Sequence, residues 1–228
     1  MRIAEDNPDT FDGAAVYSPL VLRLYDWWVL GVSNRFAWDC PTREVLLPFF
    51  RAHIGHRHLD VGVGTGFYLA EARPPSSTRV VLMDLNPQSL YAAQARAGLT
   101  FTRVVRHDVM QPLPPDVGYG LDSISLFYLL HCLPGTMLQK ARVFANLKGH
   151  LAPGGVVYGA TILGDEADHN ALGRKLMRIY NGKGIFGNQS DTRDGLERAL
   201  ARHFSWFTVR VVGKVALFEA REPRLAVP

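Results

Sequence analysis

A glycine-rich turn constrains the fold of this chain more than any other feature of its sequence. Gly62, Gly64 and Gly66 follow an apolar run and precede a helix-like segment. Glycines in this arrangement let a backbone turn tightly and approach a nucleotide-like ligand with no side chain in between. Asp84 ends the next apolar run, about 20 residues after the turn, where the hydroxyls of a ribose are commonly held. The sequence therefore predicts a strand that ends at a nucleotide-binding turn.

Predicted strands and helices alternate from residue 57 onward, which is typical of a parallel sheet with helices on both faces. Two β-rich runs separated by Gly213 and Lys214 predict a hairpin that adds a reversed strand. Pro153-Gly154-Gly155 predicts a sharp stop between a helix and the fifth strand. The predicted strands are 57–63, 79–84, 100–107, 121–127, 155–161, 206–212 and 215–220, and the predicted helices are 67–73, 87–97, 136–151, 170–180 and 191–204.

Composition excludes several classes of protein. With 228 residues, of which 47% are hydrophobic, the chain can bury the core of one α/β domain. The formal charge is +4, but the basic residues are scattered, which argues against nucleic-acid binding. No apolar run reaches the ~18 residues of a membrane-spanning helix, and the amino terminus lacks the plan of a secretory signal. We therefore expect a cytoplasmic protein with no membrane partner; the sequence carries no signal for its oligomeric state.

No metal site is predicted. Cys40 and Cys132 are too few for a disulfide framework or a metal cage. His53, His56 and His58 lie close together but have no carboxylate or thiol beside them.

Five motifs, taken in order, resemble those of the class I S-adenosylmethionine-dependent methyltransferases. The resemblance is close over residues 55–161, although Val63 departs from the Cys or Ala commonly found there. It implies a Rossmann-like, doubly wound sheet of seven strands, mostly parallel with a reversed C-terminal strand, and S-adenosylmethionine as the cofactor. The motifs are Asp60-Val-Gly-Val-Gly-Thr-Gly66, Asp84, His107-Asp108-Val109, Leu121 to Phe127 with Leu130-His131, and Leu151-Ala-Pro-Gly-Gly155. The cofactor-binding residues that this resemblance implies are Asp60, Gly62, Gly64, Gly66, Asp84, Leu85, Asp108, Val109 and Leu126.

The acidic residues support the same cofactor on physical grounds. Asp60, Asp84 and Asp108 fall at predicted carboxyl ends of strands, where open parallel sheets bind their ligands. A ring of acids repels a pyrophosphate but suits a sulfonium, an amine and a ribose. The glycine spacing also differs from the Gly-x-Gly-x-x-Gly of dinucleotide enzymes. An alternative remains that these acids, Asp108 above all, only cap helices.

His131 follows the fourth strand, close to where the resemblance places the methyl group. A base is needed only if the acceptor must lose a proton. His131 is therefore our candidate for a general base, and the alternative is a packed or capping histidine.

The aromatic segment of residues 17–38 predicts one or two short helices, and residues 43–54 predict a further one. Residues 17–38 carry more aromatic rings than a surface helix needs, so we interpret residues 1–54 as a lid that shields the sulfonium by cation–π contact. Plain packing on the sheet is the alternative. The Gly-rich stretch 181–188 is a second candidate wall of the acceptor pocket, and its glycines suit a mobile loop; the alternative is that it only connects two elements. The segment supplies Tyr25 as a cofactor contact, and the predicted residues of the acceptor pocket or lid are Tyr17, Trp28, Trp38, Tyr128 and Phe186.

We therefore expect one methyltransferase domain acting on a small molecule, with secondary metabolism as its setting. Its expected parts are a lid (1–54), a cofactor-binding core (55–161), an acceptor-side insertion (162–190) and a terminal helix with a hairpin (191–228). Three alternatives stay open: non-methyl chemistry on S-adenosylmethionine (aminocarboxypropyl transfer or internal cyclisation), a non-catalytic cofactor-binding subunit, and a dinucleotide oxidoreductase.

Overall fold

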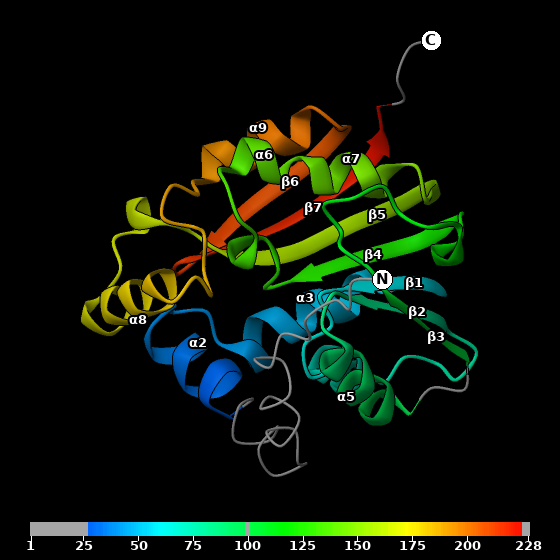
Figure 1. The fold of residues 1–228 in the computed structure, drawn as a ribbon, viewed down its shortest axis with the longest axis horizontal. Coiled ribbons are helices and arrows are strands. Elements are labelled where there is room, and N and C mark those ends of the chain that lie inside the picture. Colours follow the sequence, from blue (N-terminus) through cyan, green and yellow to red (C-terminus); the bar gives the residue numbers. More distant parts are fainter. Residues whose placement is uncertain (1–26, 99–100, 225–228) are drawn as a thin grey trace, which may run out of the picture.

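A seven-stranded sheet forms the centre of the protein. The computed structural model describes residues 27–98 and 101–224. The strand order is β3-β2-β1-β4-β5-β7-β6, as Figure 1 shows. β7 runs antiparallel to both of its neighbours, β5 and β6, whereas the other neighbouring strands of this sheet pair in parallel, which confirms the predicted reversed strand. The strands are β1 (Arg57–Val61), β2 (Arg79–Asp84), β3 (Phe101–Arg106), β4 (Leu121–Phe127), β5 (Leu151–Ile162), β6 (Phe204–Val212) and β7 (Val215–Pro223).

The strand order reverses beside β1. This strand pairs in parallel with β2 on one side and with β4 on the other. The chain therefore runs outward to β3 and then returns across the sheet. A crevice at the carboxyl ends of the strands, next to such a reversal, is where open α/β sheets bind ligands.

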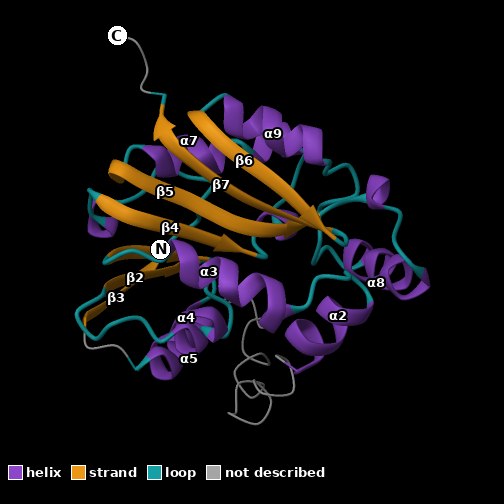
Figure 2. Ribbon diagram, turned by 180° about the vertical axis from the view of Figure 1, so that it is seen from behind, coloured by secondary structure: helices purple, strands orange, loops and turns teal. Residues whose placement is uncertain are grey.

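Helices cover both faces of the sheet, with one hydrophobic cluster under each layer. Figures 1 and 2, taken from opposite sides, show α3, α4 and α5 in one layer and α6, α7 and α9 in the other. Helix α8 lies beside α2, and a Cβ on its Gly173 would be 2.9 Å from the Ala37 carbonyl oxygen. The helices are α2 (Asn34–Phe36), α3 (Leu47–His53), α4 (Phe67–Ala72), α5 (Pro87–Ala97), α6 (Met137–Lys140), α7 (Arg142–Lys148), α8 (Ala171–Gly182) and α9 (Arg193–Ala201).

The N-terminal part of the described chain is helical, as predicted. Two π-helical stretches, η3 (Trp27–Ser33) and η4 (Thr42–Leu46), lead into α2 and α3 respectively. Three short 3-10 turns, η5 (Pro115–Val117), η6 (Leu130–Cys132) and η7 (Asp165–Ala167), lie in the connections. None of the helices among the described residues has the length and apolar character needed to cross a membrane.

The predicted stop at Pro153-Gly154-Gly155 is wrong, because these residues lie inside β5. Leu121 pairs with Leu151, whereas Ser123 pairs with Val156, so β5 carries extra residues between the two pairs. Proline is tolerated in a strand at such a bulge, where no ladder hydrogen bond is required of it. The helix predicted over 136–151 is likewise divided into α6 and α7, and it ends before β5 begins.

Candidate functional site

The three glycines of the turn after β1 have different surroundings, although all have positive φ. A Cβ on Gly66 would lie 2.7 Å from Ala93 Cα on α5, and a Cβ on Gly62 would lie 2.9 Å from the Leu129 side chain. At Gly64 no described heavy atom comes within 4 Å of that position. Gly62 and Gly66 therefore allow close packing within the protein. Gly64 leaves open space into which a ligand can fit.

Asp60 lies under this turn as a buried carboxyl group. Ser125 Oγ, on the neighbouring strand β4, donates a hydrogen bond to Asp60 Oδ1 at 2.5 Å. Ser125 Oγ also lies 3.2 Å from Nε2 of the buried His58. Burial raises the pKa of Asp60 to about 6, with the Ser125 hydrogen bond opposing the shift and the charge of Asp84 adding to it. Asp60 thus combines a fixed orientation with a high free energy of ionisation, which a cationic ligand would lower.

Asp84 ends β2 and binds the glycine turn. Its Oδ1 accepts a hydrogen bond from the Asn86 backbone N–H at 2.9 Å. Burial raises its pKa, opposed by hydrogen bonds from backbone N–H groups that include those of Val63 and Gly64. The carboxyl group therefore lies at the edge of the turn, where the resemblance places the ribose.

The other predicted cofactor contacts occupy several environments. Asp108 Oδ1 accepts from the Met110 N–H at 2.9 Å in a local turn, so this acid does not cap a helix. Leu85 is 62% exposed beside Asp84, whereas Val109 is buried in the core and its carbonyl accepts from Asn146. Leu126 also lies in the core, fully buried. The next two residues, Phe127 and Tyr128, line the cavity described below.

A cavity of about 120 Å³ lies against the glycine turn. Asp60 and Gly64 line it together with an aromatic wall of Phe67, Tyr68, Phe127 and Tyr128, and with Leu30 of η3. Phe67, Tyr68 and Leu30 are not among the predicted site residues. Phe67 and Tyr68 directly follow Gly66 at the start of α4, and this adjacency is the signal that would have identified them.

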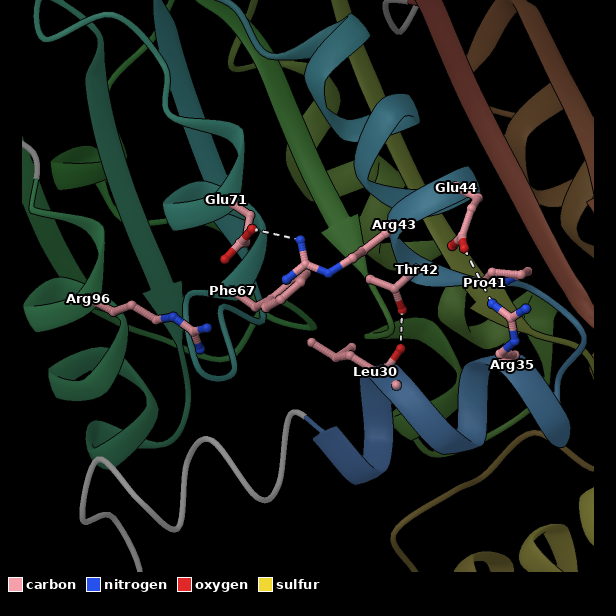
Figure 3. A pocket seen from close by; sticks show the side chains of 10 residues that line it. Leu30, Arg35, Pro41, Thr42, Arg43, Glu44, Phe67, Glu71 and Arg96 are labelled. Carbon is pink, nitrogen blue, oxygen red and sulfur yellow. Dashed lines mark hydrogen bonds and ion pairs between the residues drawn. The ribbon is translucent and has the colours of Figure 1, made fainter.

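A second cavity, of about 480 Å³, adjoins the first and shares Leu30 and Phe67 with it. The guanidinium carbons of Arg96 and Arg43 lie 5.4 Å and 6.0 Å from the centre of the Phe67 ring. Figure 3 shows Arg43 paired with Glu71, at 3.1 Å. Aromatic and charged groups of the N-terminal segment and of α4 and α5 therefore line this second cavity.

His131 is buried after β4, and its Nδ1 accepts a hydrogen bond from the Ile162 backbone N–H at 3.3 Å. Burial, and to a lesser extent the charge of Lys140, lowers the pKa of His131 to about 3. The ring is thus neutral at physiological pH, with its proton on Nε2. It packs edge-on against Phe186, with ring centres 4.6 Å apart.

The predicted acceptor-side residues form an aromatic cluster around His131. Phe186 contacts Trp38 at 6.3 Å, and Tyr128 contacts His131 at 5.3 Å, both between ring centres. Trp38 is 2% exposed, so it packs in the core, and this position favours the packing alternative over a lid for this residue. Tyr17 and Tyr25 lie outside the described residues, and of Trp28 the structure describes only the backbone.

Hydrogen bonds fix the Gly-rich stretch 181–188. The Gly187 N–H donates to the His131 carbonyl at 2.8 Å, and Lys140 Nζ donates to the Gly187 carbonyl at 2.9 Å. Asn188 Nδ2 donates to the Ile162 carbonyl at 3.0 Å. These contacts hold Phe186 against His131 and favour a fixed wall over a mobile loop.

The donor set of this site suits an organic cation more than a metal ion. Within the two described ranges no three His, Cys, Asp or Glu side chains gather as metal ligands. Asp60 lines the cavity at the open glycine backbone, and Asp84 accepts hydrogen bonds from that backbone, which matches an ammonium group and a ribose diol. The residues present therefore fit S-adenosylmethionine.

Comparisons with known proteins agree with this fit. Residues 59–157 match the sequence model of a protein family described as a methyltransferase domain. The chain is 45% identical over 213 residues to a physcion biosynthesis cluster O-methyltransferase of Aspergillus chevalieri, covering 93% of this chain and 96% of that one. It is 51% identical over 192 residues to the putative uncharacterized protein YbcY of Escherichia coli strain K12, covering 84% and 98%.

Solved structures share the fold. The DhpI–SAH complex matches with a TM-score of 0.62 at 19% identity, covering 89% of this chain and 92% of that chain. The curated relatives extend the similarity well beyond the glycine turn, over nearly the whole sequence. The chain therefore belongs to the class I S-adenosylmethionine-dependent methyltransferases.

Proposed function

We propose that this enzyme methylates an oxygen atom of a small-molecule acceptor in secondary metabolism. The supporting observation is the extent of the similarity to the physcion-cluster O-methyltransferase, which covers 93% of this chain. The residues outside this match are fewer than the residues of the interval 162–190, so the match includes residues of that interval. The resemblance thus includes the segment that packs beside the site as well as the cofactor-binding core.

The cofactor supplies a methyl group that its sulfonium already activates. Within this proposal, the Asp60 carboxylate attracts the ammonium group of the methionine portion, and Asp84 accepts hydrogen bonds from the ribose hydroxyls. Gly64 lets the ligand lie against the backbone, and the exposed Leu85 side chain packs on the adenine. Asp108 faces the adenine amino group. Catalysis then consists mainly of holding the acceptor in line and excluding water.

We assign His131 to the wall of the acceptor site and not to proton removal. A group whose pKa is about 3 is a weak base at neutral pH. Its Nδ1 is also occupied by the Ile162 N–H. Replacing His131 with Gln therefore leaves the pH–rate profile unchanged above pH 5, although KM for the acceptor rises. A lost ionisation in the profile would restore His131 as the base.

We divide the chain accordingly, into an N-terminal cover (1–54), a cofactor-binding core (55–161), an acceptor-side insertion (162–190) and a terminal helix with its hairpin (191–228). Trp38, Tyr128 and Phe186 support this division, because they bring the cover, the core and the insertion together around His131.

The test is a screen of small molecules with methyl-labelled S-adenosylmethionine, followed by analysis of both products. The proposal expects labelled O-methyl product and an equal amount of S-adenosylhomocysteine. Methylthioadenosine would identify non-methyl chemistry instead. Binding without turnover on any acceptor, reversed by adding a cell extract, would identify a cofactor-binding subunit. A labelled N-methyl product would support methyl transfer but would overturn the assignment of oxygen as the methylated atom.

A further inference from the structure

Tyr128 has an uncommon backbone conformation at the end of β4. Its φ is 60°, in the left-handed region that bulky side chains rarely adopt. Such strain persists where the surroundings hold it, and it concentrates at functional sites. Here the Tyr128 N–H donates to the Ala160 carbonyl at 2.8 Å, and the hydroxyl donates to Asn34 Oδ1 at 2.9 Å. The ring therefore extends from the sheet to the N-terminal segment.

A directed chain of hydrogen bonds continues from Asn34. This residue is fully buried, and its Nδ2 donates to Thr42 Oγ1 at 2.7 Å. The Thr42 hydroxyl in turn donates to the Leu30 carbonyl, as Figure 3 shows. Burial raises the pKa of Tyr128 well above its usual range, so the tyrosine keeps its proton and donates throughout physiological pH. The side-chain polar groups of Tyr128, Asn34 and Thr42 thus have defined hydrogen-bond partners.

This chain of hydrogen bonds joins two walls of one cavity. Tyr128 and Leu30 both line the cavity at the glycine turn, and they come from opposite ends of the hydrogen-bond chain. Apolar side chains would pack this junction without the cost of burying an amide and two hydroxyls. Polar groups instead fix one geometry, because any shift of η3 breaks a buried hydrogen bond.

We propose that Tyr128, Asn34 and Thr42 form a positioning device that holds η3, with Val29 and Leu30, over the cofactor cavity. The inference rests on the proposed placement of the cofactor at the glycine turn. None of the three residues needs to touch the reacting atoms. They set how completely the N-terminal segment covers the bound cofactor.

The experiment measures binding of S-adenosylhomocysteine by calorimetry and hydrogen exchange of residues 27–33, both on the full chain. Tyr128→Phe leaves Asn34 Oδ1 buried without its donor, so the affinity falls about tenfold. Exchange at 27–33 rises, whereas exchange in β1 and β4 stays as in the wild type. Thr42→Val, which removes the hydrogen bonds of the Thr42 hydroxyl to both Asn34 and Leu30, changes affinity and exchange in the same direction.

A double-mutant cycle separates positioning from packing. Asn34→Leu combined with Tyr128→Phe replaces both partners with apolar groups, so the double variant binds better than the sum of the single losses predicts. Tyr91→Phe, on an exposed face of α5, is the matched control and binds as the wild type does. Additive losses, or faster exchange throughout the sheet, would overturn the inference.

A further variant distinguishes this inference from the placement on which it rests. Gly64→Val fills the open space at the turn and, where circular dichroism shows the variant folded despite the positive φ of this position, abolishes binding if the cofactor lies there. Normal binding by Gly64→Val would refute the placement itself. Loss of binding in Gly64→Val, with unchanged binding and exchange in Tyr128→Phe and Thr42→Val, would refute the positioning device alone.

Discussion

Asp60 shows how one buried carboxyl group can oppose folding and promote binding. Its pKa of about 6 in the folded chain exceeds the ordinary 3.8, so folding favours the protonated form. The folded state binds more protons than the unfolded state between these two values. Stability of the cofactor-free enzyme therefore falls as the pH rises from about 4 to about 6, by about 3 kcal/mol for a shift of this size. The ionised form is nevertheless the one that attracts an ammonium group.

Asp60→Asn should separate these two effects. An amide accepts the Ser125 hydrogen bond without the cost of a buried charge, so the cofactor-free variant melts several degrees higher at pH 7.5. Affinity for S-adenosylhomocysteine falls at least tenfold, and scanning calorimetry with titration calorimetry measures both. The affinity of the wild type for S-adenosylhomocysteine falls as the pH drops through about 6, and the raised pKa of Asp84 contributes in the same direction. The Asp60→Asn variant loses most of this pH dependence. A variant that is both less stable and equally pH-dependent would contradict this account.

At the scale of single elements, α6 is held to the stretch before α9 by a buried ion pair. Lys140 Nζ lies 2.5 Å from Asp191 Oδ2, and both side chains are fully buried. Asp191 immediately precedes Thr192, whose hydroxyl accepts the Gly195 N–H as the N-cap of α9. Because Lys140 also binds the Gly187 carbonyl, the pair fixes the wall that carries Phe186.

Lys140→Met should lower the free energy of unfolding by about 3–5 kcal/mol, since it leaves the Asp191 carboxylate buried without a counter-charge. Adding Asp191→Leu should restore most of the loss, because apolar groups of similar volume often replace a buried pair at little cost. Urea denaturation of the two variants measures this. If Lys140→Met alone stays within 1 kcal/mol of the wild type, the pair is not what stabilises this wall.

The sequence predicted elements better than it predicted contacts between them. Asp60 and Asp84 could be placed because apolar runs mark where their strands end, and parallel strand ends meet at one edge. The partnership of Tyr128 with Asn34 spans 94 residues and leaves no periodic pattern. The bulge at Pro153 was misinterpreted as a turn because proline and glycine carry the same signal in both settings. The sequence could not separate Leu126, which lies in the core, from Phe127 and Tyr128, which line the cavity, because adjacent residues of a strand face opposite sides of the sheet.

Across the whole molecule, the N-terminal segment meets the last hairpin. The Lys214 N–H donates to the Trp38 carbonyl at 2.8 Å, and Gly213 forms the turn between β6 and β7. A Cβ on Gly213 would lie 2.3 Å from that carbonyl oxygen. Two parts of the chain separated by most of its length are therefore in backbone contact.

Gly213→Ala should cost about 3 kcal/mol, since it combines a positive φ with this close approach to Trp38. Gly98→Ala is the matched control. It has a similar φ of +60°, but no described heavy atom within 4 Å of the added carbon, so it costs only about 1 kcal/mol. Chemical denaturation compares the two. Equal losses would show that backbone conformation alone accounts for the effect at Gly213.

The contact between Trp38 and Lys214 has a consequence for synthesis on the ribosome. The backbone contact of Trp38 with Lys214 cannot form until Lys214 has left the exit tunnel, and β7 must then insert between β5 and β6. A nascent chain can complete the glycine turn and the contact of Tyr128 with Asn34 before this point, whereas the backbone contact at Trp38 forms only after Lys214 has emerged. Cofactor present during translation can therefore meet the glycine turn before Trp38 and Lys214 are in contact.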